Sequence, residues 1–169
     1  MGSYGIGKAE CCEWVRNNFD MDASVLDVGA CDGIWQALLP EYDMDAVEAF
    51  KPNADRIRRH NIYMNVYCTE IKDYEYDWYD LIIFGDVIEH MDVETAQAVL
   101  NYAYPRCKDM IVAVPYLYEQ DEIYGNPYEK HLQPDLTAEL FAERYPGFEV
   151  LVQLIPSYCY YHKKGQNNE

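Results

Sequence analysis

Short apolar runs recur along the chain, and most of the segments that separate them are long enough to hold a helix. The runs are four to six residues long and rich in apolar, β-branched or aromatic side chains, as strands buried on both faces of a sheet are. The predicted strands are residues 24–28, 45–48, 63–68, 80–84 and 110–114. Two further β-rich segments, 148–154 and 157–162, have no helix between them, so we expect a closing antiparallel hairpin.

The segments between the strands carry residues that start and stop helices. Pro40 ends one helix, Pro52 stands in the first turn of another, and Asp92 can cap the next. The last helix begins at Asp135 or at Thr137, and both residue types are good N-caps. The predicted helices are residues 7–18, 33–39, 52–59, 92–102 and 135–144.

This alternation of strands and helices predicts an α/β fold. We expect a mostly parallel, seven-stranded sheet with helices on both faces and the antiparallel hairpin at its C-terminal edge. The length of 169 residues suits a single domain spanning 1–169. One long irregular stretch, residues 115–134, interrupts the pattern, and a loop of that length in a compact domain is usually functional.

The charge balance narrows the choice of partners. Thirteen basic residues stand against thirty acidic ones, so the formal net charge is −17. Such a surface repels nucleic acid and anionic membranes, and we expect neither as a partner. The one basic cluster, residues 51–60, lies near the C-terminal end of a predicted helix, where positive charge opposes the helix dipole.

The cysteines and the absence of long apolar segments bear on location. The six cysteines form no C-x-x-C pair, and no apolar run reaches membrane-spanning length. No N-terminal apolar leader is present either. We therefore expect a reduced, cytoplasmic protein, of an oligomeric state that the sequence does not indicate.

The first predicted strand leads into a glycine-bearing turn, Val25–Gly33, with the sequence VLDVGACDG. Glycines at a strand-to-helix turn allow a ligand to approach the backbone closely, which suits either a dinucleotide or S-adenosylmethionine. The dinucleotide fingerprint requires glycine at positions 31 and 34, where this chain has Cys31 and Ile34. Asp27 would repel a pyrophosphate, whereas it would attract the ammonium group of S-adenosylmethionine, directly or through water.

A second acidic residue stands where a ribose would be bound. Glu48 ends the second predicted strand, 19 residues after Gly29, and an acid at about that distance can accept hydrogen bonds from both ribose hydroxyls.

Three segments together resemble the class I, Rossmann-like family of S-adenosylmethionine-dependent methyltransferases. Val25–Gly33 resembles the first motif of that family, residues 46–50 (AVEAF) the second, and residues 79–91 (YDLIIFGDVIEHM) the fourth-strand motif. The resemblance covers roughly residues 24–155 and includes the C-terminal half of small-molecule members. It implies S-adenosyl-L-methionine as cofactor and transfer of its methyl group to a small-molecule acceptor. Cys31 departs from the family, which has a glycine there.

The resemblance also implies a set of cofactor-binding residues, most of them directly after strands. At the methionine end these are Asp27, Gly29, Gly33 and Asp86; at the ribose and adenosine, Glu48, Ala49 and Phe50; at the adenine, Glu70 and Ile71.

The acceptor end is less well defined by the sequence. Methyl transfer relies on proximity and orientation, but an oxygen acceptor also needs a base, and His90 and His131 are the candidate catalytic residues. Tyrosines in the stretch 115–134 can either shape a pocket for a flat acceptor or close a small core.

A metal-assisted reaction is an alternative to purely organic catalysis. Asp86, Glu89 and His90 form a D-x-x-E-H run that, with His131, resembles the metal ligands of small RNA 2′-O-methyltransferases and of some ubiquinone-pathway methyltransferases. The alternative function is then methylation of a hydroxyl, 2′-O or catechol-like, with a divalent metal. Metal-independent members of the family carry an EH pair here too, so the sequence by itself assigns no metal. A module that binds the cofactor without catalysis is the third possibility.

Overall fold

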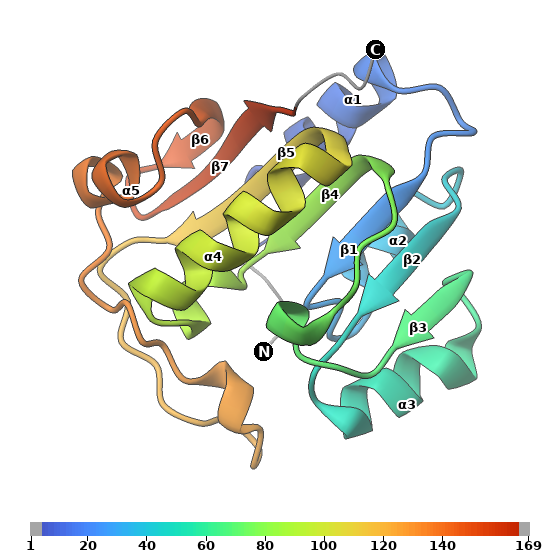
Figure 1. Ribbon diagram of the computed structural model, residues 1–169, viewed down its shortest axis with the longest axis horizontal. Helices are drawn as coiled ribbons and strands as arrows, with labels where there is room; N and C mark the ends of the chain where they lie inside the picture. The colour runs from blue at the N-terminus through green and yellow to red at the C-terminus, as the bar shows by residue number, and fades with distance from the viewer. Residues whose placement is uncertain (1–4, 166–169) are drawn as a thin grey trace.

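A seven-stranded sheet forms the centre of the molecule in the computed structural model, which describes residues 5–165 (Figure 1). Its strands lie in the order β3-β2-β1-β4-β5-β7-β6, and the first five in this order run parallel. The strands are β1 Val25–Val28, β2 Met44–Val47, β3 Asn65–Tyr67, β4 Tyr79–Gly85, β5 Cys107–Pro115, β6 Glu149–Ile155 and β7 Tyr158–Lys164. β7 is antiparallel to both β5 and β6, which confirms the predicted edge hairpin.

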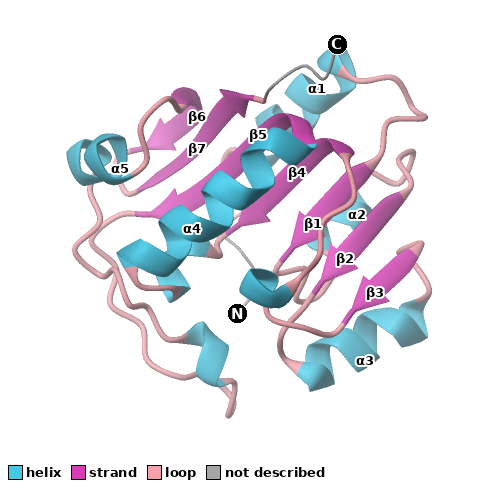
Figure 2. Ribbon diagram, in the orientation of Figure 1, coloured by secondary structure: helices cyan, strands magenta, loops and turns pink. Residues whose placement is uncertain are grey.

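Helices cover both faces of this sheet, as predicted, and Figure 2 shows α4 lying across the near face while α1 and α2 lie behind it. Side chains of α1, α2 and α3 join one apolar core, and side chains of α4 and α5 join the core on the opposite face. The helices are α1 Lys8–Asn18, α2 Ile34–Leu38, α3 Lys51–His60, α4 Val93–Ala103 and α5 Ala138–Arg144. No described helix is long and apolar enough to cross a membrane.

The helix caps follow from short polar side chains at the predicted positions. The Asp92 carboxylate accepts a hydrogen bond from the backbone N–H of Thr95 at 2.8 Å, which satisfies one of the free donors at the start of α4. At α5 the cap is Thr137, whose hydroxyl accepts from the N–H of Leu140 at 3.2 Å. Asp135, the other candidate, pairs instead with Arg144 near the helix end.

The parallel strands bury side chains on both faces. Along β1, Leu26 and Val28 enter the core under α4, whereas Val25 enters the core under α1 to α3. Asp27 alternates with Leu26 and Val28 and therefore faces the α1 to α3 side, in register with Ala46 of β2. The carboxyl ends of the parallel strands meet at one edge of the sheet, where open α/β sheets bind their ligands.

Candidate functional site

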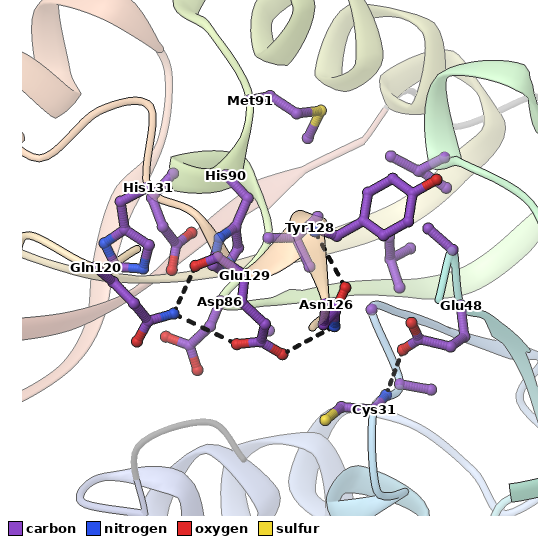
Figure 3. Close-up of a pocket in the computed structure, with 18 of the residues that line it drawn as sticks. Cys31, Glu48, Asp86, His90, Met91, Gln120, Asn126, Tyr128, Glu129 and His131 are labelled. Atoms are coloured by element: carbon purple, nitrogen blue, oxygen red, sulfur yellow. Dashed lines mark hydrogen bonds between the residues drawn. The ribbon is translucent and has the colours of Figure 1, made fainter. Parts of the chain in front are cut away.

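A cavity of about 570 Å³ opens at the carboxyl ends of the parallel strands, a size typical of small-molecule sites (Figure 3). Its walls come from the segments that directly follow β1, β2, β3, β4 and β5, and from the long segment that ends near residue 132. The predicted residues that line it are Gly29, Glu48, Ala49, Glu70, Ile71, Asp86, His90 and His131.

The turn after β1 requires an unusual backbone. Gly29 and Gly33 have φ values of 71° and 81°, a left-handed conformation that favours glycine. A Cβ on Gly29 would lie 2.6 Å from Cγ2 of Val87, so the turn also packs closely against the segment after β4. Cys31 adopts a φ of 48° at the place where the family has glycine, so the turn accommodates this side chain.

Glu48 connects the turns that follow β1 and β2. One of its oxygens accepts from the N–H of Cys31 and the other from the N–H of Phe50, each at 2.8 Å (Figure 3 shows the bond to Cys31). The residue is 5% exposed, and its burial raises the pKa of the carboxyl, against the effect of the two N–H donors. A carboxylate oxygen has more than one lone pair, so each oxygen can still accept from a ligand hydroxyl in the cavity.

Three of the predicted cofactor residues, Asp27, Gly33 and Phe50, are not among the residues that line the cavity. Asp27 is fully buried and accepts a hydrogen bond from the Tyr63 hydroxyl at 2.5 Å. Burial raises the pKa of Asp27 to about 7. Gly33 packs against Ile62 and Tyr63, and Phe50 contributes its backbone N–H to Glu48. A role for Asp27 toward a ligand is therefore indirect, and the binding roles of all three remain predictions.

Asp86 follows β4 and lies on the cavity wall. It has a φ of 57°, which is uncommon for a residue other than glycine and typical of functional sites. The Tyr158 hydroxyl donates to its carboxylate at 2.6 Å, and Tyr158 lines the cavity as well. The left-handed turn at Asp86 thus holds a carboxylate at the end of the central strand.

His90 and His131 meet although they are far apart in the sequence. Their ring centroids are 4.7 Å apart, and the side chains lie together beside Glu129 in Figure 3. Nδ1 of His90 is 3.2 Å from the carbonyl oxygen of Lys130, and Nδ1 of His131 is 2.8 Å from that of Tyr118. A carbonyl oxygen only accepts, so these two contacts favour the tautomer with the proton on Nδ1.

Both histidines are uncharged near neutral pH. Burial, together with the neighbouring His131, lowers the pKa of His90 to about 4. Burial also lowers the pKa of His131. Such imidazoles are weaker bases than an ordinary histidine, but a neutral imidazole is the form that binds a metal.

Glu89 lies beside the two histidines. The sequence predicted a role for it only as a candidate metal ligand. Its side chain is 1% exposed, and neither carboxylate oxygen has a hydrogen-bond partner among the described residues. Burial raises the pKa of its carboxyl well above the usual range, and the charge of Asp86 adds to this effect. One donor atom from each of Glu89, His90 and His131 can be chosen such that all lie within 4.8 Å of one another.

The long segment after β5 covers this end of the cavity. The backbone N–H groups of Leu132 and Gln133 donate to the carbonyl oxygen of Glu89 at 2.8 and 3.1 Å, which attaches the segment to the turn after β4. The side-chain amide of Gln120 donates to the backbone oxygen of Glu129 at 2.6 Å. The side-chain amide of Asn126 donates to the Glu129 carboxylate at 3.3 Å (Figure 3). These three polar residues line the cavity, and no periodicity of the sequence pointed to them.

Acidic side chains dominate the charged groups on the wall. Among the described lining residues, the only lysine or arginine is Lys72, which pairs with Glu70 at 2.7 Å. The acidic lining residues are Asp32, Glu48, Glu70, Asp86, Glu89, Asp92 and Glu129. The cavity therefore favours cationic or neutral ligands over anions.

No curated protein matches the chain by sequence, and no model of a known protein family matches it. Solved structures do match it. An S-adenosylmethionine-dependent methyltransferase from Clostridium acetobutylicum ATCC 824 has a TM-score of 0.70 at 13% identity, over 95% of this chain and 91% of that one. The DhpI–SAH complex has a TM-score of 0.71 at 14% identity, over 96% and 87% of the two chains.

A third match, the plantazolicin methyltransferase BpumL in complex with SAH, has a TM-score of 0.67 at 13% identity, over 95% of this chain and 82% of that one. At these identities the comparisons establish the fold. The chain has the class I, Rossmann-like methyltransferase fold, as the three sequence motifs predicted.

Proposed function

We propose that this protein is an S-adenosylmethionine-dependent methyltransferase, formed by one domain, that methylates a small molecule. The observation that carries the proposal is Glu48, which lines the cavity and whose two oxygens accept from the backbone N–H groups of Cys31 and Phe50, next to the glycine turn after β1. Solved structures with this fold that hold SAH or SAM support the choice of cofactor. The acidic wall fits a ligand that carries an ammonium and a sulfonium.

The cofactor supplies an activated methyl group, which passes from sulfur to the acceptor atom and leaves S-adenosylhomocysteine. The chain has to bind and orient the two reactants and exclude water. In our proposal Glu48 accepts from the ribose hydroxyls, and Ala49 and Ile71 flank the adenosine. Glu70 accepts from the adenine amino group, and Asp86 lies near the methionine end. An acceptor hydroxyl or amine would then approach from the side of His90 and His131.

The acidic wall also restricts the acceptor. Glu89 and Glu129 lie beside the histidines, and the ring centroid of Tyr118 is 5.4 Å from that of His131. Tyr116 and Tyr128 also line the cavity. Among the described lining residues, no lysine or arginine other than Lys72 is present to bind an anionic acceptor. We therefore propose a neutral or cationic acceptor with a flat or apolar part that packs against the tyrosines.

The first test is binding of S-adenosylhomocysteine by isothermal titration calorimetry. We expect the wild type to bind it, and Glu48→Gln to weaken binding by about 1–3 kcal/mol, because a charge-assisted acceptor for the ribose is lost. Glu41→Gln is the matched control, since Glu41 is a surface acid paired with Arg16. Failure of the wild type to bind, or tighter binding of NAD, would contradict the proposed function. Binding without turnover on any acceptor would favour the non-catalytic module.

A second candidate function is methylation of a hydroxyl with the help of a divalent metal. The observation in its favour is the cluster of Glu89, His90 and His131, with a carboxylate that no described group satisfies. Two neutral imidazoles and a carboxylate are ligands that zinc, manganese and iron accept. A bound divalent cation would offset the negative charge and lower the pKa of an acceptor hydroxyl. Asp86, the first residue of the D-x-x-E-H run, is not part of the cluster.

Metal binding can be measured without the cofactor. We expect Mn²⁺ to bind the wild type in a calorimetric titration, and His131→Ala to reduce the affinity by more than about tenfold, since one ligand is removed. His60→Ala serves as the control, because His60 is an exposed histidine at the end of α3. Equal Mn²⁺ affinity of the wild type and His131→Ala, or no binding by either, would count against this candidate.

A further inference from the structure

The indole nitrogen of Trp35 is a buried hydrogen-bond donor that no described residue satisfies. Trp35 is 2% exposed and belongs to the first turn of α2, directly after the glycine turn that follows β1. Its Nε1 is the only nitrogen among the described buried side-chain atoms that have no hydrogen-bond partner. Buried polar groups are nearly always paired, so an indole N–H without an acceptor calls for an explanation.

The surroundings of the ring fix the position of this donor. Nζ of Lys8, at the start of α1, lies 4.2 Å from the centre of the Trp35 ring, and the ring of Tyr160 meets it edge-on at 6.2 Å. A Cβ on Gly85 would lie 2.4 Å from Nε1, so the indole nitrogen packs against the end of β4 at a place where only glycine leaves room. Trp35 and Gly85 both line the cavity, so a ligand there can supply the missing acceptor.

The order of the strands relates Trp35 to one end of the cofactor. This step rests on the proposed function, in which the adenine lies at Glu70 after β3 and the ribose at Glu48 after β2. The strand order β3-β2-β1-β4 continues this line to the turns after β1 and β4. Trp35 follows the turn after β1, and its nitrogen packs against the end of β4. The indole N–H therefore lies on the side of the amino-acid end of the cofactor.

The amino-acid end carries the one anionic group of the cofactor, a carboxylate, which needs hydrogen-bond donors. Among the described lining residues the only lysine or arginine is Lys72, and it pairs with Glu70 at the other end of this line. An indole N–H donates and does not accept, and hydrogen bonds to ionised acceptors are the stronger ones. The unsatisfied donor and the carboxylate are therefore complementary in chemistry and in place.

We infer that Trp35 binds the carboxylate of the cofactor through its indole N–H and so positions the amino-acid end beside the end of β4. Gly85 provides the room that the indole needs there. This role depends on the nitrogen of the side chain and not on its aromatic surface alone. The adenosine end, bound around Glu48, does not depend on Trp35.

Two ligands that differ only in the carboxylate test this role. S-Adenosylhomocysteine carries it, whereas S-adenosyl-3-thiopropylamine has a hydrogen atom in its place. Trp35→Phe keeps an aromatic ring and removes the N–H, and we expect it to weaken binding of S-adenosylhomocysteine by about tenfold. Binding of S-adenosyl-3-thiopropylamine should stay within about threefold of the wild type, because a change in packing affects both ligands alike. Isothermal titration calorimetry on the full chain measures both affinities.

Trp14→Phe is the matched control. Trp14 is a partly buried tryptophan of α1 that is not among the lining residues, and its ring lies 4.7 Å from that of His162. This variant should alter neither affinity. Equal loss of both ligands in Trp35→Phe would assign Trp35 a packing role and overturn the inference, as would no loss of either. A wild type that binds neither ligand would contradict the proposed function, and the inference with it.

The wild type allows a second test that does not require Trp35→Phe to fold. The indole N–H of each tryptophan gives a signal in a proton–nitrogen correlation spectrum, and the variants Trp14→Phe and Trp78→Phe identify the signal of Trp35 by elimination. We expect the Trp35 proton to shift downfield with S-adenosylhomocysteine and not with S-adenosyl-3-thiopropylamine, because a hydrogen bond to a carboxylate deshields the proton. An unchanged signal in the S-adenosylhomocysteine complex, or the same shift with both ligands, would overturn the inference.

Discussion

Replacing Glu89 with leucine is expected to make the cofactor-free protein more stable by about 1–3 kcal/mol at pH 8, because the wild type buries a carboxylate without a partner. Leucine is close in size and needs no hydrogen bonds. Urea unfolding followed by circular dichroism measures the difference. Glu13→Leu, on the exposed face of α1, should change the stability by less than about 0.5 kcal/mol.

The gain from Glu89→Leu should depend on pH. The pKa of the Glu89 carboxyl is raised in the folded state, so the folded protein binds a proton more readily than the unfolded chain does. The free energy of unfolding of the wild type therefore falls as the pH rises from the usual carboxyl pKa toward the raised pKa of Glu89. The leucine variant has no carboxyl at this position and does not show this decrease. Mn²⁺ should stabilise the wild type and leave the variant unchanged if the metal-assisted candidate is correct. A variant less stable than the wild type at pH 8 would show that Glu89 is satisfied in solution.

Asp27→Asn is expected to have the second large effect, also on stability. Burial raises the pKa of Asp27 to about 7, so the folded state retains a proton that the unfolded chain releases near pH 4. Wild-type stability should consequently decline between about pH 4 and pH 7. Asparagine cannot titrate, and its side-chain oxygen can still accept from the Tyr63 hydroxyl. Relative to the wild type, the free energy of unfolding of Asp27→Asn should rise by about 2–4 kcal/mol between pH 4 and pH 8.

Asp92→Asn provides a control of opposite sign. The N–H of Thr95 holds the pKa of Asp92 below its usual value, so the folded state favours the ionised form. Its contribution to stability is present above the usual carboxyl pKa and is lost as the pH falls. Chemical unfolding at several pH values compares the three proteins. A wild type whose stability does not decline between pH 4 and pH 7, relative to Asp27→Asn, would contradict the buried, protonated state of Asp27.

The strands and the turn motifs could be predicted because their signals are local. A run such as Leu81 to Phe84 is apolar on both faces, and only a strand covered on both sides of a sheet buries all of it. The glycines after β1 and the acid after β2 likewise lie next to the elements that place them. The motifs predicted Gly29, Glu48 and Asp86 as cofactor-binding residues, and all three line the cavity.

Side-chain partners across the fold could not be predicted in the same way. Asp27 points into the core of α1 to α3, where Tyr63, 36 residues further on, reaches it. Lys8 precedes every motif, and the sequence contains no sign that it would be buried against Trp35. The residues of the segment 115–134 follow no helical or strand period, so Gln120 and Glu129 became visible as lining residues only in the structure.

The position of β7 has a consequence for synthesis of the chain on the ribosome. β7 is the last of the described strands, yet it lies inside the sheet, between β5 and β6. Until residues 158–164 have left the exit tunnel, one edge of β5 has no partner, and β6 has no place in the sheet. The growing chain therefore exposes an apolar strand edge, Ile111–Val114, for as long as synthesis takes to pass from β5 to β7. We expect this nascent chain to be a substrate for chaperones that hold unpaired strands, and a stall before β7 to favour aggregation.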